Sequence, residues 1–389
     1  MANARGDARL PGSKVLAHAS WPASIRRLSS LRRGGSPARS DDHQAQQLRA
    51  RGMSGMLPFD SDWREPVLRE SFRAALRADL RHWLKAIGPI PGYALVDAGQ
   101  LHLTEVQLVP LLQTHALPFE PILRHTPEAG MEAVGPYLVE LENATADAVD
   151  AVVGLMEYGW VVSFLSSRLP LFKLHSHLRG CLNGILEDGA HVQLRYYDPR
   201  ILAQLLQVAP DEIRTALTGP IDTFAWWDRQ LCWQSRRGQD SSTFQSPQAA
   251  LSLPDRLIRT VGQSAQADLT YSLILSELPM SDQMEALSPH LRYQIVAELL
   301  TRARGYGLMT QANLSLFCTL GLTISPTFDQ VTSTFKTVWA NPAGADAVFA
   351  AAVDGLSATD WQAIDRLGQQ ERMAMRERFA MGMRRKTLS

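Results

Sequence analysis

The chain has few cysteines and lacks the short signatures of the common enzyme classes. Its 389 residues include three cysteines, Cys181, Cys232 and Cys318, which lie far apart and form no C-x-x-C pair. This usage excludes a closely spaced disulfide framework and is typical of free thiols in a reducing cytosol. The Rossmann, Walker, H-E-x-x-H and G-x-S-x-G patterns are also missing, so we expect neither a cofactor nor a catalytic site of these kinds.

Long hydrophobic runs and a net charge are missing as well. The longest near-apolar run, 151–165, is interrupted by Glu157 and is too short to span a bilayer, so we expect no stable membrane insertion. The chain has 39 Lys and Arg against 39 Asp and Glu, but residues 1–56 hold ten basic side chains against three acidic ones. The remainder is therefore mildly acidic, which argues against nucleic acid as a partner.

Composition divides the chain into four parts. Residues 1–56 are rich in Arg, Ser, Gly and Pro without periodicity, which predicts a disordered basic extension. From 57 to 237 strand and helix patterns alternate, and we expect an α+β or α/β lobe in which helices flank a mixed sheet. Residues 238–252 are polar and predict a linker. From 253 to 389 the apolar residues, such as Leu291, Ile295 and Leu299, recur at helical spacing only, which predicts an all-α lobe.

Both ends of the chain carry basic residues whose role is open. The Arg/Ser-rich start imitates a mitochondrial transit peptide, but translated upstream sequence with a working start at Met53 or Met56 is the simpler hypothesis. Near the other end, Met373, Arg376 and Met383 belong to a basic, Met-rich helix. Flexible Met side chains suit an adaptable partner surface, although an ordinary frayed terminal helix explains the same pattern.

The most informative stretch begins at Leu171 and reads L-F-K-L-H-S-H-L-R-G-C-L-N-G-I-L-E-D-G-A-H-V-Q-L-R-Y-Y-D-P-R. Apolar residues at spacings of three and four predict a helix that extends to Ile185. Asp188-Gly189 is a turn signal, and residues 191–197 read as a strand. Pro199 fixes its own φ and disfavours helical backbone before it, so the next helix begins there.

This stretch places charges beside apolar and aromatic residues. Arg179, Arg195, Asp198 and Arg200 all fall in it, and charges are seldom buried unless they are paired. One interpretation is a site that binds an acidic group. The other, which we favour, is an internal network of ion pairs and tyrosine hydrogen bonds that holds the helix, turn and strand together.

Two further groups of residues have a structural and a functional interpretation. His175 and His177, with Asp188 and His191, could bind a metal ion from a strand, but on a helix the two histidines point apart. We therefore expect no metal, and local hydrogen bonds at the start of the helix instead. The second group consists of Trp226, Trp227 and Trp233. These rings could form a ligand platform or an interface, although core and edge packing of a hairpin is the simpler interpretation.

Several strings taken in order resemble one family. They are Y-A-L-V-D-A-G (93–99), T-P-E-A (126–129), G-P-Y-L-V-E-L (135–141), Y-G-W (158–160), L-H-S-H-L-R (174–179), D-G (188–189), L-R-Y-Y-D-P-R (194–200), and G-P-I followed by W-W (219–227). Each string is weak alone, but their order and spacing are specific. Together the strings resemble the effector adaptors, or effector chaperones, of type VI secretion.

The resemblance implies a cytoplasmic, non-catalytic adaptor of a Gram-negative bacterium. Such a protein binds a secreted toxic effector and helps to load it onto the valine-glycine-repeat (VgrG) spike protein, and it needs no cofactor. Two alternatives stay open: a metal-dependent hydrolase-like enzyme built on His175, His177 and Asp188, with Arg195 beside them, and an immunity protein against a toxin. The family-motif residues carried over, as structural or partner-binding positions, are Gly135, Pro136, Tyr137, Arg179, Asp188, Gly189, Arg195, Tyr196, Tyr197, Asp198, Pro199, Arg200, Gly219 and Pro220.

Overall fold

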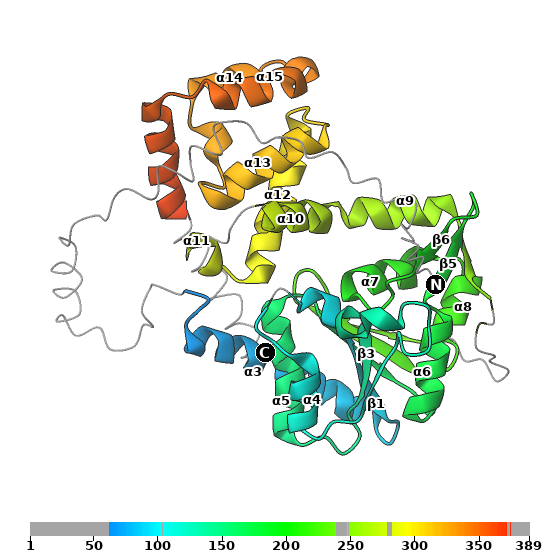
Figure 1. The fold of residues 1–389 in the computed structure, drawn as a ribbon. Coiled ribbons are helices and arrows are strands. Elements are labelled where there is room, and N and C mark those ends of the chain that lie inside the picture. The colour runs from blue at the N-terminus through cyan, green and yellow to red at the C-terminus, as the bar shows by residue number, and fades with distance from the viewer. Residues whose placement is uncertain are drawn as a thin grey trace, which may run out of the picture.

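The computed structural model describes residues 62–371, apart from 103, 239–246, 248 and 278–281, together with residue 374 (Figure 1). The predictions for 1–56 and for Met373, Arg376 and Met383 lie outside the described residues. The predicted fold class is confirmed, because a region that mixes strands and helices is followed by an all-helical region. In the described part of the chain, none of the helices is both long and apolar enough to cross a membrane.

Six strands form the main sheet, in the order β2-β3-β1-β4-β7-β8, and all of the neighbouring pairs are antiparallel. Residues 121–125 have the apolar pattern of a short strand, but the strand that this pattern predicts is wrong, because β2 ends at Pro121 and a turn follows. At the other edge β7 and β8 form the hairpin that the sequence predicts for a sheet edge. The strands are β1 (Gly92–Asp97), β2 (Phe119–Pro121), β3 (Pro136–Glu140), β4 (Val162–Ser166), β7 (Thr223–Trp227) and β8 (Trp233–Arg237).

A second sheet of three strands lies beside the first. It consists of β6 (His191–Gln193), β5 (Asn183–Leu186) and β9 (Leu251–Leu253), and β9 runs parallel to β5. The predicted boundary between linker and helical lobe, at 252/253, therefore falls inside a strand. Gly184 permits this pairing, because a Cβ there would lie 2.3 Å from the Leu253 side chain.

Two boundaries predicted for the informative stretch are wrong. The helix α6 (Leu171–Gly180) ends before Ile185, which lies in β5, and the following strand stops at Gln193 instead of reaching Tyr197. A short apolar run fits the period of a helix as well as that of a strand, so its pattern does not mark the end of the helix. Tyr196 and Tyr197 lie beyond the end of the strand, and both rings are buried in the core.

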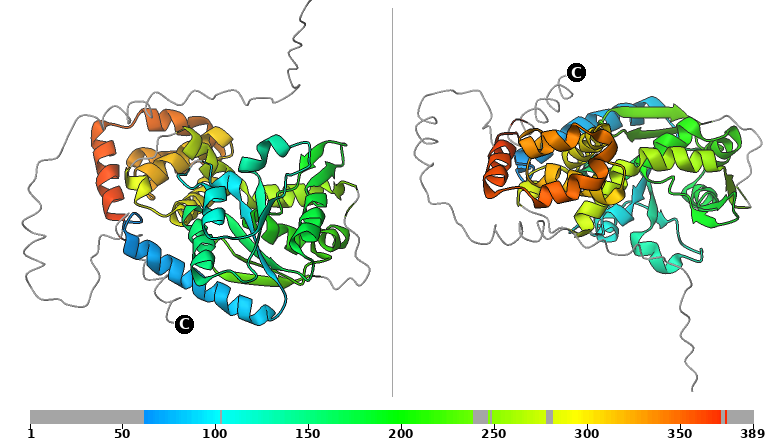
Figure 2. Two further views of the ribbon diagram at one scale, coloured as in Figure 1. Left: turned by 60° about the horizontal axis from the view of Figure 1, so that its bottom comes forward. Right: turned by 90° about the horizontal axis from the view of Figure 1, so that it is seen from above.

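Helices cover both faces of the main sheet, as the alternation along β1 shows. Ala94 and Val96 face α3 (Pro66–Ile87) and α5 (Ala146–Gly154), and Tyr93 and Leu95 face the opposite core. That opposite core contains α6, α7 (Pro199–Val208) and α8 (Asp211–Thr218). The long α3, in blue, starts beside the helical region and runs along the α/β region (Figure 2). The small helix α4 (Leu108–Thr114) packs on the same face as α3.

The helical region begins on the surface of the α/β region and extends away from it. Its first helix, α9 (Asp255–Ser264), packs on α7 with Leu257 in the same core, and α10 (Gln266–Glu277) follows it directly (Figure 1). The predicted stripe of Leu291, Ile295 and Leu299 is buried in one helix, as expected. The other helices are α11 (Asp282–Glu285), α12 (Pro289–Gly305), α13 (Gln311–Thr323), α14 (Ser333–Trp339), α15 (Pro342–Asp354) and the helical residues 358–371.

One hydrophobic core joins the two regions. It contains Val152 and Val162 from the α/β region as well as Leu291 and Phe317 from the helical region. At about 25 cal/mol per Å² of apolar surface, a core that continues across a boundary holds two regions together more firmly than a polar contact does. We refer below to this boundary as the seam.

Candidate functional site

A chain of six alternating charges crosses the seam. Arg195 pairs with Asp97 at 2.8 Å and contacts Asp198 at 3.7 Å. Arg200 pairs with Asp198 at 2.7 Å and with Asp268 of α10 at 2.9 Å, and the chain ends where Arg229 meets Asp268 at 2.8 Å. Three carboxylates therefore balance three guanidinium groups, and Asp268 is the contribution of the helical region.

Local sequence chemistry places the centre of this chain. Asp198 is the N-cap of α7, and its carboxylate accepts a hydrogen bond from the Arg200 backbone N–H at 3.0 Å. Pro199 occupies the first turn, where its missing N–H and fixed φ do not disturb the helix. The same carboxylate accepts from Nε and Nη2 of Arg200, so the start of α7 holds both charges in one geometry.

Burial and pairing shift the pKa values of these carboxylates in opposite directions. Burial acts to raise the pKa of Asp198, but the neighbouring Arg200 and Arg195 outweigh it and hold the pKa below its usual value. At Asp97 burial prevails over Arg195, with Asp198 adding repulsion, and the pKa is raised. Asp198 is therefore the better stabilised anion of the pair, and removing either of its arginines would leave a charge buried without compensation.

Aromatic rings form the second part of the seam. His290, in the first turn of α12, donates from Nε2 to the Met156 carbonyl at 2.7 Å, and its ring lies 4.4 Å from that of Trp160. Tyr293 packs on the same Trp160 at 5.0 Å and carries the Arg229 guanidinium over its own ring at 5.8 Å. Burial lowers the pKa of His290 to about 4, so the imidazole is neutral at physiological pH.

The two tyrosines of the central string anchor the segment that carries the charges. Tyr196 is fully buried and donates its hydroxyl hydrogen to the Leu178 carbonyl at 2.7 Å. Tyr197 lies under the Arg195 guanidinium at 5.7 Å, and burial raises its pKa to about 12. Arg179 donates to the Arg124 carbonyl at 3.4 Å, which ties α6 to the turn after β2. These residues connect strands and helices within the α/β region.

The glycine-containing strings occupy turns and close contacts. Gly189 has φ +84°, and Asp188 accepts from the Ala190 N–H at 2.9 Å, which closes the turn between β5 and β6. A Cβ on Gly135 would lie 2.6 Å from the Leu123 side chain. The remaining motif residues flank elements: Pro136 begins β3, Tyr137 packs on Phe119, Gly219 ends α8, and the Pro220 carbonyl accepts from Ser167.

The structure does not gather the residues of the metal-site alternative. His175 and His177 are both buried in α6 and donate from Nε2 to the Pro121 and Leu217 carbonyls, at 3.0 and 3.1 Å. These carbonyl partners are 54 and 40 residues away, so the expectation of local hydrogen bonds is wrong for them, although Nε2 of His177 also lies 3.7 Å from Sγ of Cys181, four residues on. Burial lowers the pKa of His177 to about 4. Among the described residues, no three His, Cys, Asp or Glu side chains are grouped so that they could hold a metal ion.

The three tryptophans lie on two faces of the edge hairpin. Trp227 and Trp233 pack at 4.8 Å on one face, and Trp83 of α3 lies 6.2 Å from Trp233. Trp226 points to the opposite face, into the core that contains α6, α7 and α8. Alternation along β7 therefore separates neighbouring rings and gives each face of the sheet its own aromatic contacts.

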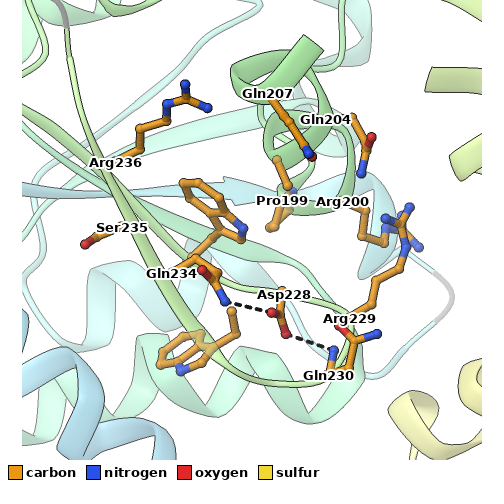
Figure 3. A pocket seen from close by; sticks show the side chains of 13 residues that line it. Pro199, Arg200, Gln204, Gln207, Asp228, Arg229, Gln230, Gln234, Ser235 and Arg236 are labelled. Atoms are coloured by element: carbon orange, nitrogen blue, oxygen red, sulfur yellow. Dashed lines mark hydrogen bonds between the residues drawn. The ribbon is translucent and has the colours of Figure 1, made fainter. Parts of the chain in front are cut away.

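A cavity of about 590 Å³ opens between α7 and the β7–β8 hairpin (Figure 3). Its walls are mostly polar, and Arg236 stands at the end opposite to Arg200 and Arg229 (Figure 3). Asp228 is held by Gln234 at 2.8 Å and by the Gln230 backbone N–H at 2.9 Å. The lining residues are Pro199, Arg200, Ala203, Gln204, Gln207, Trp226, Trp227, Asp228, Arg229, Gln230, Gln234, Ser235 and Arg236.

Hydrogen-bond donors dominate this cavity. The indole N–H of Trp226, 7% exposed, and the Nε–H of Arg229 are both buried without an acceptor. An indole N–H and a guanidinium can only donate, so a partner for either of these two groups would have to be an acceptor such as a carbonyl or carboxylate oxygen. We call this cavity the β8 pocket.

Sequence reasoning missed half of this arrangement. It singled out Arg195, Asp198 and Arg200 but not their partners Asp268 and Arg229. The missed residues lie 68 and 39 positions from their partners in the network. No spacing rule connects them, although Asp97 stands in the first motif string and offered a partial signal.

Comparisons with known proteins point to the α/β region. No curated protein and no solved structure matches the chain. One family, described as "Domain of unknown function (DUF4123)", matches residues 92–216. The matched range starts at β1 and ends in α8, so it contains Asp97 and the whole 194–200 string. This part of the chain is thus similar to a family that is associated with adaptors of type VI secretion effectors.

Proposed function

We propose that the protein is a non-catalytic cytosolic adaptor that binds a type VI secretion effector and helps to load it onto a VgrG spike. The single observation that carries this proposal is the match of residues 92–216 to a family associated with such adaptors. The match covers the segment in which the charges, tyrosines and turns of the motif strings meet. The fold alone would not name the function, because one fold hosts many functions.

The roles of the motif residues support the proposal. Asp198 caps a helix, Tyr196 bonds a backbone carbonyl and Gly189 forms a turn. Groups with these tasks specify a shape, whereas a catalytic site needs a nucleophile or base aimed at a reacting atom. The seam adds a shared core and the Asp268 contacts, which hold the helical region in a fixed position beside the α/β region. A rigid frame with a donor-rich pocket suits the recognition of another protein.

A pull-down from the native cytosol tests the proposal. The full chain, tagged at one end, should recover one large effector together with a VgrG spike, and an untagged lysate is the control. Deletion of the gene should abolish secretion of that effector while the other effectors of the system are still secreted, and the wild-type gene should restore it.

Three results would contradict the proposal in different ways. Recovery of a toxin without the spike would favour the immunity protein. Recovery of neither protein, from cells that express the secretion system, would overturn the adaptor function. Stoichiometric zinc or manganese in the purified chain would contradict its non-catalytic character and revive the hydrolase alternative.

A further inference from the structure

The outer edge of β8 is open within the described part of the chain. The main sheet ends at β8, and β8 pairs only with β7. Hydrogen bonds just beyond both ends of this ladder join the Asp228 N–H to the Cys232 carbonyl and the Gly238 N–H to the Asp222 carbonyl. Because bonded pairs alternate in an antiparallel ladder, Gln234 and Arg236 bond to β7 and Ser235 directs its backbone groups outward.

The β8 pocket lies directly against this open edge. Gln234 is opposite Trp226 in the register and Arg236 is opposite Phe224, so both side chains point to the face that carries α7. Gln204 and Gln207 of α7 form the facing wall (Figure 3). A strand added next to β8 would therefore direct every second side chain into the pocket.

The charges of the pocket favour an acidic occupant. Arg236 forms no ion pair with any other described residue, and it is exposed. Asp228, the acidic residue among the lining side chains, already accepts from Gln234 and from backbone N–H groups. The unpaired donors of Trp226 and Arg229 lie deeper. A carboxylate that enters the pocket would meet the exposed Arg236 guanidinium, which has no acidic partner among the described residues.

We propose that the β8 edge and the β8 pocket together bind an extended, acidic segment of the partner protein. The main chain of the segment adds a strand to the sheet, and an acidic side chain of the segment enters the pocket. Main-chain hydrogen bonds then supply affinity, and the pocket selects the sequence. This inference rests on the proposed function, because the segment belongs to the effector.

Other occupants fit the edge less well. The β8 of a second copy would bring two further arginines and no acidic residue to the pair, so it would supply no contact of opposite charge. The opposite edge of the sheet is a poorer target, because β2 has three residues and includes Pro121. The arginines of β8 thus favour an acidic strand over a second copy of β8.

A display library of random peptides of about ten residues, the length of a long strand, tests the inference on the full chain. We expect enrichment of peptides that carry Asp or Glu at alternate positions. Ser235→Pro removes the outward N–H and should lower the affinity for an enriched peptide by about tenfold, which corresponds to the loss of one hydrogen bond. Ser235→Ala keeps that N–H and should bind as the wild type does.

A charge pair of variants locates the acidic side chain. Arg236→Glu should abolish binding of the acidic peptides. Arg237→Glu, on the same strand but on its opposite face, should weaken their binding much less. On binding, amide exchange should slow at Ser235. All four variants are first compared with the wild type in urea unfolding, so that a folding defect is not mistaken for lost binding.

The outcomes separate this inference from the function on which it rests. No enriched peptide, or peptides that bind Ser235→Pro as tightly as Ser235→Ala, would overturn the inference. If the effector is recovered equally by the wild type and by Ser235→Pro, the adaptor function stands and the docking site is wrong. If the peptides bind as expected but the pull-down yields no effector, the edge site stands as a peptide site and the adaptor function fails.

Discussion

The seam and the β8 pocket share Arg200 and Arg229 but use their charges differently. In the seam both guanidinium groups meet Asp268, whose side chain is 11% exposed. On the pocket side the Nε–H of Arg229 and the indole N–H of Trp226 have no acceptor. A satisfied network rigidifies a structure, whereas a buried donor without an acceptor is a feature that calls for an explanation. The comparison separates what holds the protein together from what it offers to a partner.

The largest effect should come from breaking the seam at Asp268. Asp268→Ala leaves two arginines, each with a 15% exposed side chain, without their shared carboxylate. We expect a loss of about 3–5 kcal/mol in the free energy of unfolding, measured by urea titration. The matched variant Asp211→Ala removes an ion pair of an exposed carboxylate and should cost less than about 1 kcal/mol. Equal losses of unfolding free energy in the two variants would show that the buried network stabilises the protein no more than an exposed ion pair does.

The next largest effect is a pH dependence that His290 gives to the seam. Burial lowers its folded-state pKa to about 4, below the ordinary 6.5, so the unfolded chain binds the proton more readily. The neutral His290 side chain therefore contributes about 3 kcal/mol to the free energy of unfolding. This contribution is fully present above pH 6.5 and is lost as the pH falls toward 4. His290→Gln keeps a donor for the Met156 carbonyl and should reduce the pH dependence of unfolding in this window, while the buried His177, whose pKa is also lowered to about 4, keeps its own share.

A control at an exposed position sharpens the pH test. His82 lies on the surface of α3, and His82→Gln should leave the profile as in the wild type. A wild-type profile that stays level between pH 6.5 and 4 would contradict the burial of His290 in the seam.

A smaller effect distinguishes the two edges of β8 itself. Ser235→Pro should cost less than about 1 kcal/mol in unfolding free energy, because proline is tolerated on an edge strand whose N–H faces outward. Gln234→Pro removes a donor of the β7 ladder and should cost at least about 1 kcal/mol more. The reverse order would show that the outer edge of β8 is the one already paired.

The smallest perturbation is chemical labelling of the thiols. Cys232, in the turn before β8, is exposed, whereas Cys181 and Cys318 are buried and burial raises both of their pKa values to about 12. Iodoacetamide should label Cys232 alone in the native protein, as read by mass spectrometry. Labelling of Cys318 in Asp268→Ala before the protein unfolds would show that the helical region opens first.

The spacing of apolar residues and the helix-start and turn signals predicted much of the fold, because each of them depends on residues that are close in sequence. The spacing of Leu291, Ile295 and Leu299 identified α12, and Asp198-Pro199 marked the start of α7. The pattern failed where the period was ambiguous. Ile185 continued the helical spacing of α6 but lies in β5, because β9 arrives from residue 251 to complete a sheet that no local signal announces.

By itself, the sequence determined the helix stripes, the edge hairpin and the turn at Gly189, since short-range sterics and burial set them. The tertiary structure decided which distant residues form hydrogen bonds and ion pairs with one another. His177 bonds a carbonyl 40 residues away, and Arg200 meets a carboxylate 68 residues away. Such contacts depend on how elements pack and not on spacing along the chain. The same packing decided that Trp226 joins the core with α6, α7 and α8, while Trp227, its neighbour, joins the core on the opposite face of the sheet.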